Sequence, residues 1–296
     1  MRLRLTVWFI FALGVASAVA DVDLPTKFNN QGTVGNTRHN LSQRQSSGGG
    51  PVGTLMDPYR NDYGEVCVYC HTPHGASPVS LPLWNRTIAA TTYQIYRSDS
   101  ITQPIVQPGT HSLACLSCHD GQVAVDSVIN MPGSGRYREA QWNSSDPAFL
   151  STWTNPSGTG PFTHMRLAQT ECLACHSAGA GFVGAGATDF TAFVIGTDLR
   201  DDHPVGVRYP ATGPNIDFVP MSGATSQLRF FDNNGNGRPD KNEIRVFSAT
   251  GGFRVECASC HDPHGVPSAG PGSTFVRSFL RISNSGSAVC LSCHVK

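Results

Sequence analysis

The nine residues at 257–265, Cys-Ala-Ser-Cys-His-Asp-Pro-His-Gly, constrain this chain more than any other stretch. Two cysteines separated by two residues and followed at once by histidine form the attachment pattern of a c-type haem. The two thiols can add to the vinyl groups of one porphyrin, and His261 then lies under the iron as an axial ligand. Pro263 resists helix continuation because it lacks an N–H, and three residues span at most about 10 Å. His264 therefore cannot cap the same iron, and we expect it to be the distal ligand of a second haem.

The same pattern occurs five times in the chain. The attaching cysteines and the histidines that follow them are Cys67, Cys70 and His71; Cys115, Cys118 and His119; Cys172, Cys175 and His176; Cys257, Cys260 and His261; and Cys290, Cys293 and His294. The pairs use all 10 cysteines, so none remains for another disulfide. Disulfides within each pair or zinc knuckles are the competing interpretations, but neither explains a histidine after every pair. The sequence therefore predicts five covalently bound haem c groups.

The N-terminus has the pattern of a secretory signal peptide. A basic start at residues 2–4 precedes an apolar run over 5–15, and Ala-Val-Ala at 18–20 resembles a cleavage site. We predict a signal peptide over residues 1–20 and an exported protein that begins near Asp21. No later stretch approaches the roughly 20 apolar residues that cross a bilayer, so no membrane span is predicted.

The composition argues against an ordinary apolar core. The chain has 31 Gly and 20 Pro among 296 residues, and only 14% of its residues are charged. Such a chain buries too little apolar area by itself, so porphyrins must supply the missing core. We expect one domain over residues 21–296, mostly irregular and loop-rich, with short helices and few short strands, in a multihaem cytochrome c fold wrapped around a stack of five haems. The chain is formally neutral and has no basic run, so no nucleic-acid partner is expected.

The histidine count tests the prediction of haem. Of 11 histidines, five follow cysteine pairs, and the six others are His39, His74, His111, His164, His203 and His264. Six candidates for five distal positions allow every iron to be capped by two histidines. Methionine is the rival distal ligand, but the mature methionines have no motif-like neighbours. We therefore predict bis-histidine ligation throughout.

Residues 232–243 fit the oxygen-rich calcium loop D-x-[DN]-x-[DN]-G-x5-E. The predicted ligands are the side chains of Asp232, Asn234, Asn236, Asp240 and Glu243 and the carbonyl of Arg238. Gly237 permits the sharp turn, and the flanking residues resemble strands rather than EF-hand helices. We predict a β-hairpin at 228–247 whose tip is a structural calcium loop. A polar turn without metal is the alternative.

The chain resembles bacterial multihaem cytochromes c of the doubled-CXXCH type, especially the extracellular filament-forming (nanowire) cytochromes of metal-reducing bacteria. The resemblance rests on residues 38–42, 67–75, 83–86, 115–121, 199–206, 257–265 and 290–294. It implies that His39, His74, His203 and His264 are distal ligands. The motif at 172–176 is an addition to the family pattern. His164 lies in the same added stretch and is the natural fifth distal ligand, with His111 as its competitor.

These features favour a non-enzymatic electron carrier, in which closely spaced haems allow electrons to hop. In the leading version it is an extracellular or cell-surface conduit. Its partners are then other redox proteins or extracellular acceptors, and it can associate head to tail. A monomeric periplasmic shuttle is the alternative. His39 precedes every haem motif, beside a flexible run at 46–50, so it can fold back on its own chain or reach the next subunit.

Two further classes of function have weaker support. A multihaem nitrite or sulfite reductase needs a haem with an open distal position, but every motif here ends in histidine. A calcium-dependent adhesion module rests on one loop only.

Overall fold

The computed structural model describes residues 32–41, 63, 65–78, 81–130, 165–180, 189–210, 217–266 and 279–295. Its α-helices are α1 (Thr110–His119), α3 (Cys257–Cys260) and α4 (Ala288–Cys293). Its 3-10 helices are η1 (Val34–Asn36), η3 (Cys172–Ala174), η4 (Ala178–Ala180), η5 (Thr191–Phe193) and η7 (Ser285–Ser287). Its strands are β1 (Gln94–Ile95), β2 (Asp198–Leu199), β3 (Val207–Arg208), β4 (Gly223–Ala224), β5 (Leu228–Phe230), β6 (Arg245–Ala249) and β7 (Gly252–Val255). All of these elements are short, and each of the three α-helices in the described segments carries a cysteine pair.

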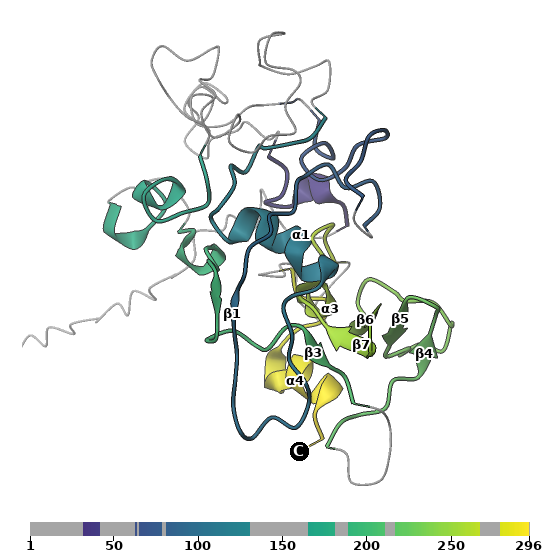
Figure 1. Cartoon of the computed structure of the whole chain (residues 1–296). Helices are drawn as coiled ribbons and strands as arrows, with labels where there is room; N and C mark the ends of the chain where they lie inside the picture. Colours follow the sequence, from purple (N-terminus) through teal and green to yellow (C-terminus); the bar gives the residue numbers. More distant parts are fainter. Residues whose placement is uncertain are drawn as a thin grey trace, which may run out of the picture.

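The strands form two separate sheets. Strands β1 and β2 pair in parallel, and the larger sheet has five antiparallel strands in the order β3-β7-β6-β5-β4. In Figure 1, α1 lies at the centre, α3 and α4 lie below it, and the five-stranded sheet lies beside α3. Strand β7 ends at Val255 and α3 begins at Cys257, so the sheet leads directly into the fourth haem motif.

The hairpin that the sequence predicts at 228–247 is present. Strands β5 and β6 pair in antiparallel register, with Leu228 opposite Phe247 and Phe230 opposite Arg245. The fully buried ring of Phe230 packs over Gly223 of β4, where a Cβ atom would lie 2.2 Å from the ring. Only glycine fits at that position of the sheet.

The apolar core is small and divided. One buried cluster is Tyr63, Tyr69 and Val128; a second is Tyr93, Leu116 and Leu199; a third is centred on Val266. Two of the clusters include a residue from between the cysteines of a haem motif, Tyr69 and Leu116. The protein therefore packs against residues between the cysteines of these motifs.

The described residues are loop-rich with short helices and strands, while the wrapping around five haems stays a prediction. No helix within these segments is long and apolar enough to span a membrane. The predicted signal peptide at 1–20 lies outside the described residues.

Candidate functional site

Each haem motif is a single helical turn that places its cysteines and histidine on one face. The N–H of the motif histidine donates to the carbonyl of the first cysteine in four motifs, at 2.8 Å (His71), 2.9 Å (His176), 3.1 Å (His261) and 2.9 Å (His294). In the remaining motif, Cys115, Cys118 and His119 lie within α1. Residues three and four positions apart lie on the same side of a helical turn. Both thiols and the imidazole can therefore face one porphyrin.

The cysteine chemistry also fits covalent haem. All ten cysteines lie in described segments and all are free thiols. In four motifs at least one of the two residues between the cysteines is buried, including Tyr69, Leu116, Leu173 and Ser259. Within the described part of the chain, no three His, Cys, Asp or Glu side chains are grouped as a zinc site would require. The thiols are thus available for two thioether bonds per motif.

Three proximal histidines are clamped by the same backbone frame, which the sequence analysis missed. His71, His261 and His294 form isolated antiparallel bridges with Trp84, Leu280 and Phe218. On each side of the histidine there is one backbone hydrogen bond, between 2.8 and 3.0 Å long. Around His71, Thr72 N donates to Leu83 O and Asn85 N donates to Cys70 O. The corresponding bonds around His261 are Asp262 N to Phe279 O and Arg281 N to Cys260 O, and those around His294 are Val295 N to Asp217 O and Val219 N to Cys293 O. The frame fixes the backbone from which each imidazole projects.

The second and third motifs are held differently. The carbonyl of His119 accepts from Ile195 N and Gly196 N at 2.9 and 3.0 Å, and the carbonyl of His176 accepts from Phe190 N at 2.7 Å. The ring of His176 stacks on Phe190 at 3.9 Å. In both motifs a later segment of the chain folds back over the histidine.

Four predicted iron ligands have Nδ1 bound to a backbone carbonyl. The acceptors are Pro82 O for His71 (2.8 Å), Phe193 O for His119 (2.6 Å), Pro263 O for His39 (3.4 Å) and Pro204 O for His203 (3.2 Å). A carbonyl only accepts, so Nδ1 carries the proton and Nε2 keeps its lone pair. That tautomer, held by an outer hydrogen bond, is the one that metal-binding histidines use.

Three of these rings, those of His39, His119 and His203, have a lowered pKa. Burial, followed by the neighbouring His119, lowers the pKa of His39 to about 4. Burial likewise lowers the pKa of His119 and of His203. A neutral imidazole is the protonation state that binds iron.

Two pairs of predicted ligands lie at the spacing of two imidazoles on one iron. The ring centres of His71 and His264 are 6.0 Å apart with planes 13° from parallel, and those of His39 and His119 are 6.2 Å apart with planes at 85°. Since metal–imidazole bonds are about 2 Å long, imidazoles on opposite sides of one ion have ring centres about 6 Å apart. His203 is an electrostatic neighbour of His294, which makes a third candidate pair.

The other candidate ligands are placed less fully. The carbonyl of His74 accepts from Thr72 Oγ1 at 2.9 Å and from Asn130 Nδ2 at 3.0 Å, which holds the backbone of this exposed residue. The ring of His111 stacks on Phe247, with centres 3.8 Å apart. His164 lies outside the described residues. The contact with Phe247 places the ring of His111 against β6.

The motifs lie next to one another. The thiols of Cys115 and Cys257 share a hydrogen bond, which joins the second motif to the fourth. Burial and the nearby Cys118 raise the pKa of Cys70 to about 12, which places the first motif beside the second. Burial, together with Cys260, likewise raises the pKa of Cys293 to about 12, which places the fourth motif beside the fifth. Motifs one, two, four and five therefore form a contiguous row.

Two buried charges fasten motifs to α1, and the sequence analysis missed both. Arg86 is 1% exposed and donates to Ser117 Oγ and to the carbonyls of Ser117, Ala124, Val125 and Ser127 at 2.7–3.1 Å. Glu256 accepts from Gly109 N, at the start of α1, at 3.0 and 3.2 Å, and from Ser112 Oγ at 2.5 Å. In a chain with few charged residues, a charged residue close to a haem motif is the sequence signal that would have identified Arg86 and Glu256.

A third buried charge lies beside a predicted iron ligand. Asp262 Oδ1 accepts from the backbone N–H of His264 and contacts its Nδ1, both at 3.1 Å, while Oδ2 accepts from Arg281 Nη1 at 3.2 Å. Burial alone would raise the pKa of Asp262, but the hydrogen bond with His264 and the charge of Arg281 outweigh burial and lower it to about 2. Asp262 is therefore a carboxylate that holds the Nδ1 of His264.

An unpartnered donor also fits a bound haem. The indole Nε1 of Trp84 is buried and has no hydrogen-bond partner among the described residues. The Trp84 ring lies edge-on to His71, with centres 5.8 Å apart. A haem propionate is an acceptor that could satisfy such a donor.

The predicted calcium loop is folded around its carboxylates. Asp232 accepts from the N–H groups of Asn236 and Gly237 at 3.1 and 2.9 Å, and Gly237 has the positive φ of 71° that the sharp turn needs. Glu243 is 1% exposed and accepts from the N–H groups of Asn233 and Asp240 at 2.8 and 3.0 Å.

The amide groups of this loop point their nitrogens inward. Asn234 Nδ2 and Asn236 Nδ2 both donate to Asp240 Oδ2, at 2.8 and 2.9 Å, and Arg238 N donates to Asn236 Oδ1 at 2.8 Å. These bonds give the loop internal partners, and calcium binding would require both amides to turn their oxygens inward. Calcium therefore stays a prediction.

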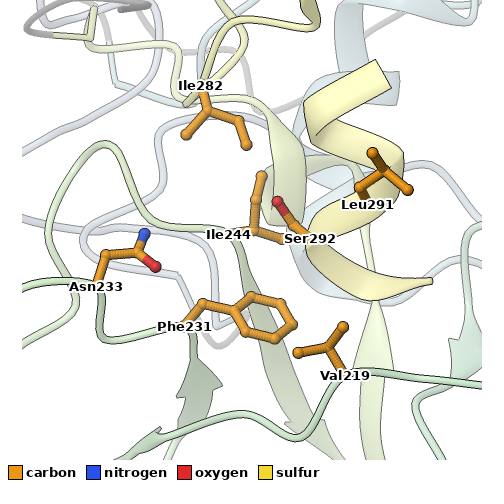
Figure 2. Close-up of a pocket in the computed structure, with 7 residues that line it drawn as sticks. All are labelled: Val219, Phe231, Asn233, Ile244, Ile282, Leu291 and Ser292. Atoms are coloured by element: carbon orange, nitrogen blue, oxygen red, sulfur yellow. The ribbon is translucent and has the colours of Figure 1, made fainter. Parts of the chain in front are cut away.

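A small cavity of about 200 Å³ lies between the sheet and α4. Figure 2 shows its lining residues, Val219, Phe231, Asn233, Ile244, Ile282, Leu291 and Ser292. Sites for drug-sized ligands measure roughly 300–1,000 Å³, so this cavity is too small for a porphyrin. Leu291 and Ser292, between the cysteines of the fifth motif, are among its lining residues.

Comparison with known proteins agrees with the motif geometry. A family model described as "Doubled CXXCH motif" matches residues 251–296, which contain the fourth and fifth motifs. No curated protein matches the chain. The family match supports a multihaem c-type cytochrome, a protein that binds haem c covalently through CXXCH motifs and transfers electrons.

Proposed function

We propose that this chain carries electrons through five closely spaced bis-histidine haem c groups and has no enzymatic reaction of its own. The observation that carries this proposal is the pairing of His71 with His264 and of His39 with His119 at 6.0 and 6.2 Å. Haem c, when bound, supplies the one-electron chemistry, and the chain supplies ligation, spacing and burial. The row of neighbouring motifs supports hopping from one haem to the next.

The proposed ligand set assigns two histidines to each iron. His264 caps the haem of His71, His39 caps that of His119, and His203 caps that of His294. His74 and His164 complete the haems of His176 and His261. His111 is left out because it lies outside the pattern that the resemblance covers.

The intact mass of the secreted protein tests the haem number. We expect five porphyrin additions and a first residue near Asp21. Replacing Cys172 and Cys175 with alanine should remove one addition and leave four. Fewer than five additions to the unmutated chain would mean that one motif is misassigned.

Spectroscopy tests the ligand pairs and separates a carrier from a reductase. We expect a ferric spectrum that is low-spin throughout and unchanged by nitrite or CO. Electron paramagnetic resonance should resolve two classes of low-spin haem, because the 13° and 85° ring angles split the iron d orbitals differently. A high-spin haem that responds to nitrite would instead support the reductase alternative.

We also propose that the protein acts outside the cell and can polymerise by exchanging the segment that carries His39. In a single chain that segment is held by the contact of His39 with His119 and by a bond from Lys241 Nζ to Gly32 O at 2.9 Å. The same contacts made between copies would give a head-to-tail filament. If so, His39→Ala abolishes polymers seen by electron microscopy while the monomer keeps five haems. A secreted protein that stays monomeric at high concentration would instead be the shuttle.

Finally, we propose that the loop at 232–243 binds calcium in a structural role. Its support is the match to the calcium-loop pattern together with the inward-facing carboxylates of Asp232 and Glu243.

A further inference from the structure

The first and fourth haem motifs have the same backbone frame but different side chains at matching positions. Thr72 and Asp262 follow the proximal histidine and donate their N–H across the bridge. The backbone N–H groups of Asn85 and Arg281 donate in the opposite direction, to the carbonyl of the second cysteine of the motif. The first motif therefore has a neutral pair where the fourth has a carboxylate and a guanidinium.

This difference reaches the second histidine of each motif. In the first motif, Thr72 Oγ1 donates to the carbonyl oxygen of His74 at 2.9 Å. In the fourth, the Asp262 carboxylate contacts the ring Nδ1 of His264 at 3.1 Å. The side chain thus reaches the backbone in one motif and the imidazole in the other.

We propose that Asp262 acts as a positioning residue that gives the haem capped by His264 a lower reduction potential than the haem capped by His74. The inference rests on the proposed bis-histidine ligation. A carboxylate that accepts the Nδ1–H of an iron ligand makes the imidazole a stronger electron donor. Stronger donation stabilises ferric iron over ferrous iron, and hydrogen bonding around the ligands is one of the means by which proteins set haem potentials.

The Asp262 carboxylate is held so that Oδ1 contacts His264. The residue is 7% exposed, and Arg281 Nη1 takes the other oxygen at 3.2 Å. Arg281 is itself buried and donates to the carbonyls of Lys241 and Ala258 at 2.9 and 3.2 Å. The guanidinium offsets the net charge of the carboxylate. The effect on His264 therefore comes through the directed, charge-assisted hydrogen bond.

In the other predicted ligands whose Nδ1 contact is described, Nδ1 is hydrogen-bonded to a neutral group. His39, His71, His119 and His203 contact backbone carbonyls, so among these five ligands His264 alone contacts a carboxylate. A haem of lower potential in the row transfers its electron downhill to its neighbours. The position of Asp262 therefore gives the row a local direction.

The first test is Asp262→Asn in the full haem-loaded protein, followed by potentiometric titration. We expect one of the five midpoint potentials to rise and the resonance signal of that haem to shift, while mass and low-spin spectrum still report five bis-histidine haems. Asp99→Asn, the same substitution at an exposed position, is the matched control, and it should leave the potentials unchanged. Unchanged potentials in Asp262→Asn with five low-spin haems would overturn the inference and leave the proposed function intact.

A second measurement does not depend on the Asp262 variant. His264→Met and His74→Met each identify, by the potential that moves, the haem that the histidine caps. In the unmutated protein the potential assigned through His264 must be the lower of the two. The reverse order would overturn the inference, whereas a high-spin haem in the unmutated protein would contradict the proposed function itself.

Discussion

The first and fourth haem motifs are both fastened to α1, but by opposite charges. After the first motif, the Arg86 guanidinium uses its N–H groups on one hydroxyl and four carbonyls. Before the fourth motif, the Glu256 carboxylate accepts from the N–H of Gly109, the residue before α1, and from Ser112 Oγ. The same pair of backbone hydrogen bonds flanks the proximal histidine in both of these motifs. Main-chain bonds therefore set the orientation of the ligand, and a single buried charge sets where each motif sits against α1.

Removing the anchor of the first motif should have the largest effect on stability. Arg86→Met keeps the volume but leaves the buried acceptors without donors, so we expect the free energy of unfolding to fall by about 3 kcal/mol or more. Guanidinium chloride unfolding of the haem-loaded protein measures it. Arg97 is exposed, and Arg97→Met should change the free energy of unfolding by less than about 0.5 kcal/mol. Equal losses in the two variants would show that the buried contacts of Arg86 are not an anchor.

The anchor of the fourth motif should contribute less. Glu256→Gln keeps one acceptor oxygen but loses the charge opposite the N-terminus of α1, and we expect a loss of about 1–2 kcal/mol. The same unfolding measurement applies, with Glu65→Gln at an exposed position as the control. A loss larger than that of Arg86→Met would reverse the order of the two anchors.

The smallest effect should come from the loop at 232–243, whose Lys241 carbonyl accepts from Arg281, the residue that hydrogen-bonds Cys260 of the fourth motif. Asp232→Ala leaves two backbone N–H groups without their carboxylate, so we expect a loss of about 1 kcal/mol without calcium. Thermal unfolding should no longer respond to calcium in this variant or in Glu243→Ala, and haem spectra should change little. Asp99→Ala, at an exposed site, is the control. If chelator and added calcium leave the unmutated protein unaffected, the loop is a polar turn.

Sequence patterns predicted local features well and side-chain partners poorly. The spacing of cysteines and histidine fits one helical turn, and the structure has such a turn at each motif. The hairpin at 228–247 also followed from local pattern, and β5 and β6 pair there in antiparallel register. By contrast, the contact between Glu256 and Gly109 joins residues 147 positions apart, and nothing local in either segment indicates the other.

The histidine pairs show the same limit. Counting histidines predicted enough ligands, but not that His264 faces His71 or that His39 faces His119. The choice between an arm folded back and an arm exchanged was open, and within one chain the structure has His39 beside its own His119. The sequence could not show that the ring of His111 packs on Phe247, because that contact depends on the five-stranded sheet.

The bond between Glu256 and the start of α1 also bears on the order of folding. It closes a loop of 147 residues that contains the second and third motifs. Closing so long a loop carries an entropic cost and cannot happen until residue 256 has been made. Until then the cysteines of α1 lie on an open chain, accessible to whatever joins porphyrin to thiol. Covalent attachment at the second motif can thus precede the final contacts of α1. The contact with Glu256 forms after the chain is complete and then holds α1 against the fourth motif.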